Sequence, residues 1–278
     1  MSDSSLVFEK IEREESHSFI GEGLFQKVAF FFIIVLTIEI LWYGVFLPLQ
    51  PFQSIQMSPL EGYSREQLLA MAGITKSSSY FNLSVPATIQ ALERIPEVES
   101  VTVQKQFPSS LVITIVPRHA VAILLLSVEN KICPAYVDRE GVIYKIKTSV
   151  QHPETTVFNL PVLSGIEFRG ENPVGSRLPS ALVPFLARLE VIQRSNPQLF
   201  QCLSEIRILQ KAYGNYELVL YPLHYPIRVL TNLQLNEETL RYMILVLDVL
   251  TQKGVQVSEV DFRSGTVSFR EKEASSGN

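Results

Sequence analysis

The sequence has few of the residues that build metal centres or disulfide frameworks. Its 278 residues include only two cysteines, Cys133 and Cys202, which stand far apart in the chain. Two such cysteines give no disulfide framework, although a single bridge between them stays open in an oxidising compartment. The histidines do not follow the spacing of zinc ligands; they are His17, His119, His152 and His224. We therefore expect no metal site and no cofactor.

Net charge is also missing from most of the chain. Residues 48–278 contain 21 Lys and Arg against 21 Asp and Glu. A nucleic-acid-binding protein needs a strongly basic face, and this balance argues against one. The same balance gives no strong electrostatic attraction to an anionic membrane surface. Composition therefore argues against a nucleic-acid partner.

The common catalytic motifs are absent as well. The sequence contains no G-x-S-x-G, no H-E-x-x-H and no phosphate-binding loop. Asp138-Arg139-Glu140 is a charged turn, which we expect at a solvated hairpin tip rather than in an acid–base pair. We expect a protein that is not an enzyme. The catalytic alternative is a membrane-anchored envelope hydrolase, which would need Asp138 or Glu140 for activity.

One long hydrophobic run stands out against these absences. Residues 28–47, VAFFFIIVLTIEILWYGVFL, contain a single ionisable side chain. As a helix they would span about 30 Å, the hydrocarbon thickness of a bilayer. A cleaved signal peptide would have a shorter apolar region and a small-residue cleavage site, so we predict an uncleaved transmembrane helix. A short tail (1–27) before a long body is typical of a signal anchor, with the tail in the cytoplasm and the body exported.

Glu39 is the ionisable residue inside this run. A carboxylate within a membrane costs free energy, so it marks a possible functional site. One interpretation is that Glu39 contacts the transmembrane helix of a partner. The other is that its side chain is protonated or reaches the interface near the outer third of the helix.

A small α+β unit is expected after the anchor, over residues 52–126. Its hydrophobic periodicity predicts the order strand, helix, helix, strand, strand. Ser64 and Gln67 form a capping box at the start of the first helix, which Gly73 closes. Pro86 fits the first turn of the second helix. This order places two helices on one face of a three-stranded sheet.

Four segments of this unit resemble the POTRA domain of the FtsQ/DivIB family of bacterial cell-division proteins. They are residues 80–83, 89–98, 101–108 and 111–122. The family's run is close to L-x-x-I-P-x-V-x-x-A-x-V-x-R-x-W-P-x-x-L-x-I-x-V-x-E-R-x-P-V-A. Here Phe107 stands for the common Trp, and Pro117-Arg118-His119 stands for Glu-Arg-x. The order of tail, single anchor and POTRA domain is also the family's layout.

Three later segments resemble further family motifs. Residues 135–144, a hairpin around Gly141, resemble (V/L)-D-x-x-G-x-(V/I)-(F/Y). Residues 160–165 resemble L-P-x-L-x-G. Residues 257–270 resemble the closing pair of strands, (V/I)-D-(L/M)-R … G-x-x-V-x. The resemblance therefore extends over about 28–270.

Amphipathic patterns add two helices between these motifs. One is expected at 180–195, and the other begins after the cap Asn236 and ends at Gly254. We predict a mixed α/β C-terminal domain with an extended antiparallel sheet over 127–270. A disordered polar tail is expected over 271–278.

The family resemblance implies a non-enzymatic scaffold of the bacterial divisome. Such a protein links membrane-anchored division proteins and helps assemble or regulate septal peptidoglycan synthesis. It implies the cytoplasmic (inner) membrane at the division septum, with the C-terminal domain on the periplasmic or extracytoplasmic side. It also implies single-pass partners that resemble FtsB and FtsL.

In the family, the FtsB–FtsL pair binds near the closing strands. The last strand is short and has no strand after it, so it can accept a partner strand. The docking residues implied are Ser264, Gly265, Thr266, Val267, Ser268 and Phe269. The alternative is that Val267 and Phe269 pack on the core while another segment covers the edge.

A second function class stays open. An anchored POTRA module could act as a polypeptide chaperone or as an envelope assembly factor. That function predicts repeated POTRA units or a downstream β-barrel, and the sequence shows neither.

Overall fold

The structure is a computed structural model that describes residues 19–128, 131–147, 159–166 and 173–271. Most of the predicted tail at 1–27, and nearly all of the one at 271–278, lies outside these residues. The first described element is a long apolar helix that consists of α1 (Phe19–Leu41), a π-helical turn η1 (Trp42–Phe46) and α2 (Leu47–Leu49). Phe25–Leu49 is long and apolar enough to cross a membrane, and its most apolar stretch is nowhere buried in the protein. We call this segment the anchor helix; it fits a single-pass membrane protein.

The first folded unit confirms the predicted β-α-α-β-β order. It contains β1 (Ser54–Met57), α3 (Arg65–Met71), α4 (Val85–Glu93), β2 (Val98–Gln106) and β3 (Ser110–Pro117). The strand order is β1-β3-β2, with β1 parallel and β2 antiparallel to β3. Alternate residues of the strands face a core that α3 and α4 cover, including Leu68, Leu92 and Ile113. We call this the three-stranded unit.

The second folded unit is built on one nine-stranded sheet. Its strands are β4 (Ala122–Val128), β5 (Lys131–Val137), β6 (Ile143–Ile146), β7 (Val162–Ser164), β8 (Leu203–Gln210), β9 (Tyr216–Pro222), β10 (Arg228–Asn232), β11 (Val257–Asp261) and β12 (Ser268–Glu271). Its helices are η3 (Ser180–Leu182), α5 (Val183–Ser195), α6 (Pro197–Gln201), η4 (Ala212–Gly214) and α7 (Glu237–Gln252). We call this the nine-stranded unit.

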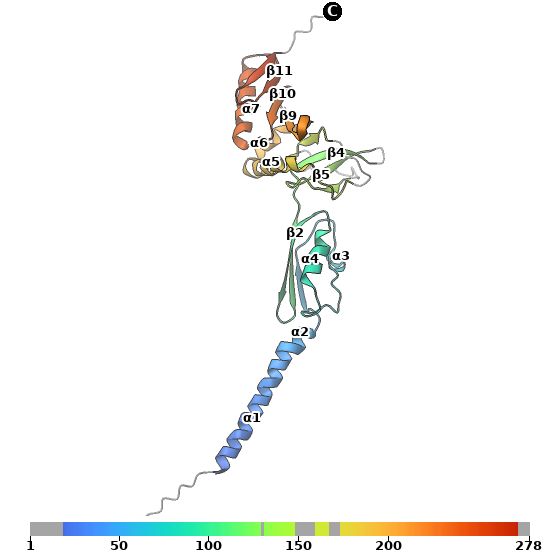
Figure 1. Cartoon of the computed structure of the whole chain (residues 1–278), viewed down its shortest axis with the longest axis vertical. Coiled ribbons are helices and arrows are strands. Elements are labelled where there is room, and N and C mark those ends of the chain that lie inside the picture. The colour runs from blue at the N-terminus through green and yellow to red at the C-terminus, as the bar shows by residue number, and fades with distance from the viewer. Residues whose placement is uncertain (1–18, 129–130, 148–158, 167–172, 272–278) are drawn as a thin grey trace, which may run out of the picture.

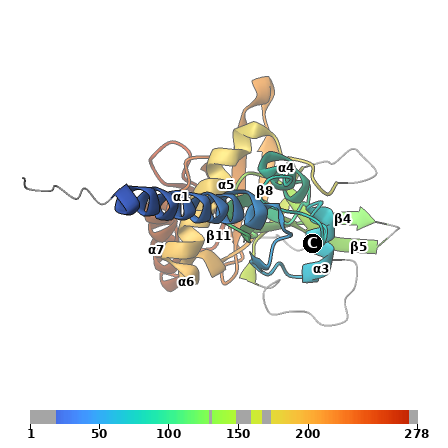
Figure 2. The same cartoon turned by 90° about the horizontal axis from the view of Figure 1, so that it is seen from below.

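The order of strands in this sheet is β12-β11-β10-β9-β8-β7-β4-β5-β6. Most neighbours are antiparallel, as predicted, but β7 runs parallel to both β4 and β8, and β10 runs parallel to β11. Buried side chains of α5, α6 and α7 join the sheet in one core, among them Phe185, Phe200 and Leu247. Figure 2 shows the β4–β5 hairpin extending away from the side on which α6 and α7 lie.

The three parts follow one another along a single long axis. Figure 1 shows the anchor helix, the three-stranded unit and the nine-stranded unit in that order, with β11 and α7 at the end far from the anchor. The change of sheet falls between Pro117 and Ala122, because β4 pairs with β5 and β7. The structure thus differs from the predicted boundary at residue 126. The apolar residues resume directly after Pro117-Arg118-His119 and run through β4, so the sequence does not reveal which sheet this strand joins.

Candidate functional site

The closing strand β12 forms one end of the nine-stranded sheet. It pairs with β11 on one side, in the register Glu259↔Arg270, Val260↔Phe269 and Asp261↔Ser268. No strand in the part of the chain that the structure describes pairs with its other side. All four residues of β12 are exposed. The strand therefore offers an open edge.

The backbone of Phe269 faces this open edge. The amide of Phe262 donates to the carbonyl of Leu230 at 2.9 Å, so Phe262 and Val260 turn their amides toward β10. The N–H and C=O groups of successive residues point to alternate sides of a strand. The N–H and C=O of Asp261 therefore point toward β12, where Asp261 pairs with Ser268. Phe269, between the two inward-facing residues of β12, directs its N–H and C=O outward.

The side chains of the closing segment divide between the two faces. Phe269 lies opposite Val260, which is fully buried, so it shares the core face of the sheet. It lies at the rim of that face and is 50 % exposed. Val267, two residues earlier, packs partly against the core. We gave as an alternative that Val267 and Phe269 both pack on the core. That description fits Val267 better than Phe269.

The structure corrects the start of the closing strand. We expected the strand from Thr266, but β12 begins at Ser268. Ser264 and Thr266 form a tight turn in which their hydroxyl groups lie 3.2 Å apart, and Gly265 adopts a φ of 78°. A left-handed residue is favourable in such a turn when it is glycine.

An ion cluster fastens this turn to the sheet. Arg263 binds Asp261 through two nitrogens and reaches Glu217 on β9 at 2.7 Å, and Lys211 contacts Glu217 at 3.1 Å. The hydrogen bonds from Arg263 lower the pKa of Asp261. Burial alone would raise the pKa of Glu217, but hydrogen bonds from Lys211 and Arg263 outweigh it and lower that pKa. The carboxyl groups of Asp261 and Glu217 are therefore ionised at neutral pH.

A groove of about 420 Å³ lies beside the same turn. Its lining includes Asn236, Glu238, Tyr242, Phe262 and Gly265. Tyr242 stands edge-on to Phe262 with ring centres 5.9 Å apart. The groove joins the closing hairpin to the start of α7.

Sequence reasoning missed an apolar stripe on the outer face of α7. Tyr242, Leu245 and Val249 are 51 %, 59 % and 41 % exposed and recur at helical spacing. The buried stripe of this helix includes Leu240, Met243 and Leu247. The available signal was the presence of large apolar residues outside that buried stripe.

The other end of the nine-stranded sheet is covered. Val142 next to β6 forms a bridge with Arg177, and the amide of Ile143 donates to the carbonyl of Ser176 at 2.9 Å. Among the described strands, β1 and β2 end the three-stranded sheet. Arg65 of α3 donates to the carbonyl of Ile55 on β1, so β2 is the more open of these two edges. The molecule thus presents β12 and β2 as candidate edges for strand addition.

The structure also corrects the expectation for Asp138-Arg139-Glu140. This turn lies at the junction of the two units, not at a solvated tip. Asp138 is buried, pairs with Arg118, and accepts the amide of Val142 at 2.8 Å. Arg139 pairs with Glu99 on β2 and with Glu190 on α5 at 3.4 Å. These ion pairs tie the three-stranded unit to the nine-stranded unit.

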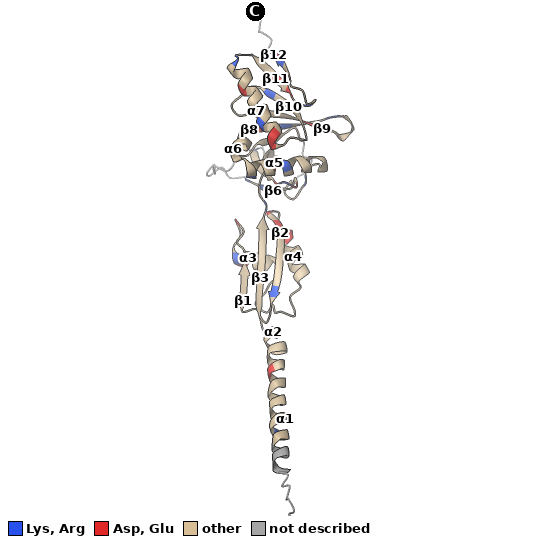
Figure 3. Ribbon diagram, turned by 90° about the vertical axis from the view of Figure 1, so that its left-hand side faces the viewer, with Lys and Arg blue, Asp and Glu red and all other residues tan. Residues whose placement is uncertain are grey.

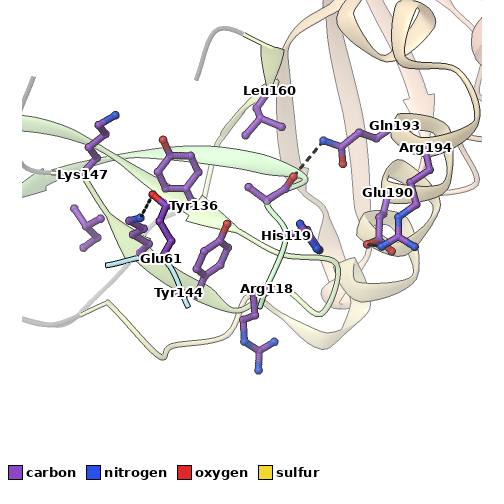
Figure 4. A pocket seen from close by; sticks show the side chains of 13 residues that line it. Glu61, Arg118, His119, Tyr136, Tyr144, Lys147, Leu160, Glu190, Gln193 and Arg194 are labelled. Carbon is purple, nitrogen blue, oxygen red and sulfur yellow. Dashed lines mark hydrogen bonds and ion pairs between the residues drawn. The ribbon is translucent and has the colours of Figure 1, made fainter. Parts of the chain in front are cut away.

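A cavity of about 720 Å³ lies at this junction. Figure 4 shows Glu190, Gln193 and Arg194 of α5 on one side and Tyr136, Tyr144 and Glu61 on the other. The carboxylates are paired with cations: Glu190 with Arg194 at 2.8 Å and Glu61 with Lys145 at 3.6 Å. Burial raises the pKa of Tyr144. The geometry is that of a structural ion-pair network.

Other sequence candidates lie apart from these sites. Glu39 is on the exposed surface of the anchor helix. Cys133 is buried on β5, and Cys202 follows α6; both are free thiols. Burial raises the pKa of the Cys202 thiol. Within the described ranges, no group of three His, Cys, Asp or Glu could hold a metal ion.

Comparisons with known proteins agree with the fold. Residues 50–118 match the family model described as POTRA domain, FtsQ-type. Cell division protein FtsQ of Geobacter sp. (strain M21) is 28 % identical over 164 residues, which are 58 % of this chain and 55 % of that protein. Cell division protein FtsQ of Myxococcus fulvus is 27 % identical over 159 residues, 56 % of this chain and 51 % of that protein.

A third relative carries the other family name. Cell division protein DivIB of Geobacillus kaustophilus is 27 % identical over 101 residues, which are 36 % of this chain and 37 % of that protein. The chain thus matches about half or less of the length of these curated relatives. Its three-stranded unit coincides with the matched POTRA domain, and the relatives agree in name. The fold and these similarities support the FtsQ/DivIB family, whose POTRA domain residues 50–118 match.

Proposed function

We propose that this protein is a non-enzymatic scaffold of the bacterial divisome. It links single-pass division proteins and helps assemble or regulate septal peptidoglycan synthesis. The relatives named cell division protein support a role in division. The observation that carries the scaffold mechanism is the open edge of β12, where Phe269 directs its backbone N–H and C=O away from the sheet.

The partners proposed are single-pass proteins that resemble FtsB and FtsL. A strand from such a partner adds to β12, with its side chains over Phe269 and the segment Ser264, Gly265, Thr266, Val267 and Ser268. Main-chain hydrogen bonds supply affinity in this mode, and pockets for side chains supply specificity. The groove beside Gly265 and the exposed stripe of α7 provide the apolar surface next to the edge.

The anchor helix sets where this binding takes place. In our proposal residues 1–27 are cytoplasmic, the helix crosses the cytoplasmic membrane, and the two folded units are periplasmic or extracytoplasmic at the septum. Confinement to one membrane raises the effective concentration of single-pass partners. Glu39, on the exposed surface of the helix, is the proposed contact with a partner's transmembrane helix.

A proline substitution at the open edge tests the strand-addition mechanism. Phe269→Pro removes an outward amide without removing a ladder bond to β11, so the sheet keeps its pairing. We expect tagged full-length Phe269→Pro to recover about tenfold less FtsB-like and FtsL-like partner from detergent extracts, the loss that about 1.4 kcal/mol gives. Phe269→Ala keeps the amide and should lose less. Tyr213→Ala, at the tip of the β8–β9 hairpin, is the matched exposed control.

If folded Phe269→Pro recovers its partners as well as the unaltered protein does, strand addition at β12 is refuted. Circular dichroism and thermal unfolding establish whether the variant is folded. Recovery lost equally in Tyr213→Ala would show that the effect is not specific to the edge.

The open edge of β2 favours a second candidate function. An anchored POTRA unit that binds extended polypeptides there would act as a chaperone or an envelope assembly factor. In that case Val103→Pro, which removes an amide of β2 that points away from β3, would abolish capture of unfolded polypeptide, and Phe269→Pro would not.

A further inference from the structure

We propose that the end of the three-stranded unit nearest the anchor rests on the lipid bilayer through Phe81 and Phe107. The occupant of this surface is the interfacial layer of the same membrane that the anchor helix crosses. Tyr80, Phe81 and Phe107, which we call the aromatic foot, form the contact. This inference is independent of the partner-binding edge, which lies at the opposite end of the molecule (Figure 1).

Hydrogen bonds tie the aromatic foot directly to the chain that leaves the anchor. The amide of Phe52 donates to the carbonyl of Ser78 at 3.0 Å, and the amide of Gln53 donates to that of Ser109 at 2.9 Å. Pro51 also forms a bridge with Ser79. The two loops that carry the aromatic side chains are therefore fixed within a few residues of the helix end.

The length of the anchor places this helix end in the headgroup layer. Phe25–Leu49 contains 25 residues, which span about 37 Å as a helix. The hydrocarbon layer is about 30 Å thick, and the headgroups add about 5 Å or more on each side. A centred helix therefore brings Leu49 into the headgroups. Four further residues lead to Gln53, so the foot cannot lie far from the lipid.

The side chains of the foot have the character of an interfacial belt. Phe81 and Phe107 are 58 % and 57 % exposed, although each is large and apolar. Both stand edge-on to Tyr80, with ring centres 5.8 Å and 6.0 Å away. Aromatic rings gather at the membrane–water interface, where one part of the surface is apolar and the other is hydrated.

The charges around the foot suit phospholipid headgroups. Lys105 donates from Nζ to the carbonyl of Tyr80 at 2.6 Å, and Lys76 lies in the same loop region and is exposed. The segments 47–60, 73–92 and 100–117 contain no Asp or Glu. In Figure 3 the end of this unit that faces the anchor shows blue and no red. Lysine beside aromatic side chains, without carboxylates, favours contact with phosphate groups.

Quenching of tryptophan fluorescence by brominated lipid tests the contact. The chain has one tryptophan, Trp42, so the Trp42→Phe variant has no tryptophan fluorescence of its own. Into it we would place Phe107→Trp, or Phe81→Trp as a second probe. The full chain is reconstituted, without other proteins, into vesicles of phosphatidylcholine brominated at the acyl positions nearest the headgroup.

Val116→Trp is the matched control, because Val116 is exposed at the far end of β3 in the same unit. It lies about 20 Å along the strand from the tip. We expect quenching of Phe107→Trp and Phe81→Trp to exceed that of Val116→Trp by about threefold or more, with blue-shifted emission, as for an interfacial ring. Native Trp42 is the positive control for lipid contact.

Equal, weak quenching of all three introduced tryptophans, with strong quenching of Trp42 in the native chain, would overturn the proposal. That result would leave the aromatic foot as a surface for a protein partner. Strong quenching of either foot probe in protein-free lipid supports the membrane contact, since no other partner is present.

Discussion

Asp138 is a buried carboxylate at the junction between the two units. One carboxylate oxygen accepts the amides of Glu140 and Val142, and the other pairs with Arg118. Its side chain is only 3 % exposed, and that of Arg118 is 11 % exposed. Both charges are thus held where water cannot replace a lost partner.

Replacing Asp138 by asparagine should destabilise the protein strongly. Asp138→Asn removes the buried carboxylate that pairs with Arg118 and leaves only the partly exposed Glu140, at 3.3 Å, as its counter-charge. We expect the free energy of unfolding to fall by about 3 kcal/mol. Chemical unfolding of the detergent-solubilised chain, followed by circular dichroism, measures it. Glu140→Gln is the matched control: Glu140 is 40 % exposed, so its loss should cost about 1 kcal/mol or less. Equal losses would contradict the account.

The ion cluster at the closing turn predicts a dependence on pH. Asp261 and Glu217 both have pKa values lowered in the folded protein from ordinary values of 3.8 and 4.5. A lowered folded pKa stabilises the fold fully above the unfolded pKa, and this stability is lost as pH falls through the folded pKa. The closing hairpin should therefore loosen below about pH 4.

Hydrogen–deuterium exchange of residues 257–271 measures this loosening. We expect faster opening of the hairpin, corrected for intrinsic exchange, when the pH falls from 5.5 to 3. In Asp261→Asn the hairpin should be open more often already at pH 5.5 and should respond less to acid. A variant with the unaltered pH response would show that the cluster does not stabilise the turn.

Residue types and their local order did not reveal the junction. Asp138-Arg139-Glu140 has the sequence of an exposed turn, and its partners lie far away in the chain, at Arg118, Glu99 and Glu190. Only the packing of α5 and β2 around the turn makes it structural. In contrast, Asp261 and Arg263 pair across only two positions of the chain, at the end of β11.

At the scale of elements, the two helix caps of the three-stranded unit differ. Ser64 accepts the amide of Gln67, and Gln67 accepts the amide of Ser64, which completes the predicted capping box. Ser84 occupies the N-cap position of α4, but its side chain makes no capping hydrogen bond. Serine is favourable at the N-cap of any helix, but the local geometry decides whether its side chain makes the bond.

Ser64→Ala should therefore weaken α3 while Ser84→Ala leaves α4 nearly unchanged. Loss of a capping side chain costs about 1 kcal/mol, which corresponds to about fivefold more frequent opening. Hydrogen–deuterium exchange of the α3 and α4 amides measures both changes. Similar effects of the two substitutions would contradict the role of the capping box.

Most strands and helices were predictable because alternation and helical spacing are strong signals. The position of β7 was not. It pairs parallel with β4 and β8. A strand of three residues is too short for its sequence to predict which strands it pairs with. The start of β12 was predicted two residues early, because Thr266 continues the alternating pattern while the chain is still turning at Gly265.

At the scale of the whole molecule, the protein is a membrane anchor followed by two units with separate cores. The elongated arrangement places the three-stranded unit beside the anchor and the closing strands at the far end (Figures 1 and 3). The predicted anchor and the POTRA fold were readable from the sequence, since each depends on local patterns. Which edges of the sheets stay open depends on long-range pairing, so the docking segment came only from the family resemblance.

Site-specific photo-crosslinking in growing cells tests whether the open edge of β12 binds a partner. A photoreactive residue at Phe269 would report on the open edge of β12, and one at Tyr213, fully exposed at a hairpin tip, would serve as control. Strand addition at β12 predicts a specific adduct between the Phe269 position and a small single-pass division protein, and none at Tyr213. Absence of that adduct, together with adducts from a probe at Thr102 on β2, would contradict it and move the partner surface to the POTRA domain.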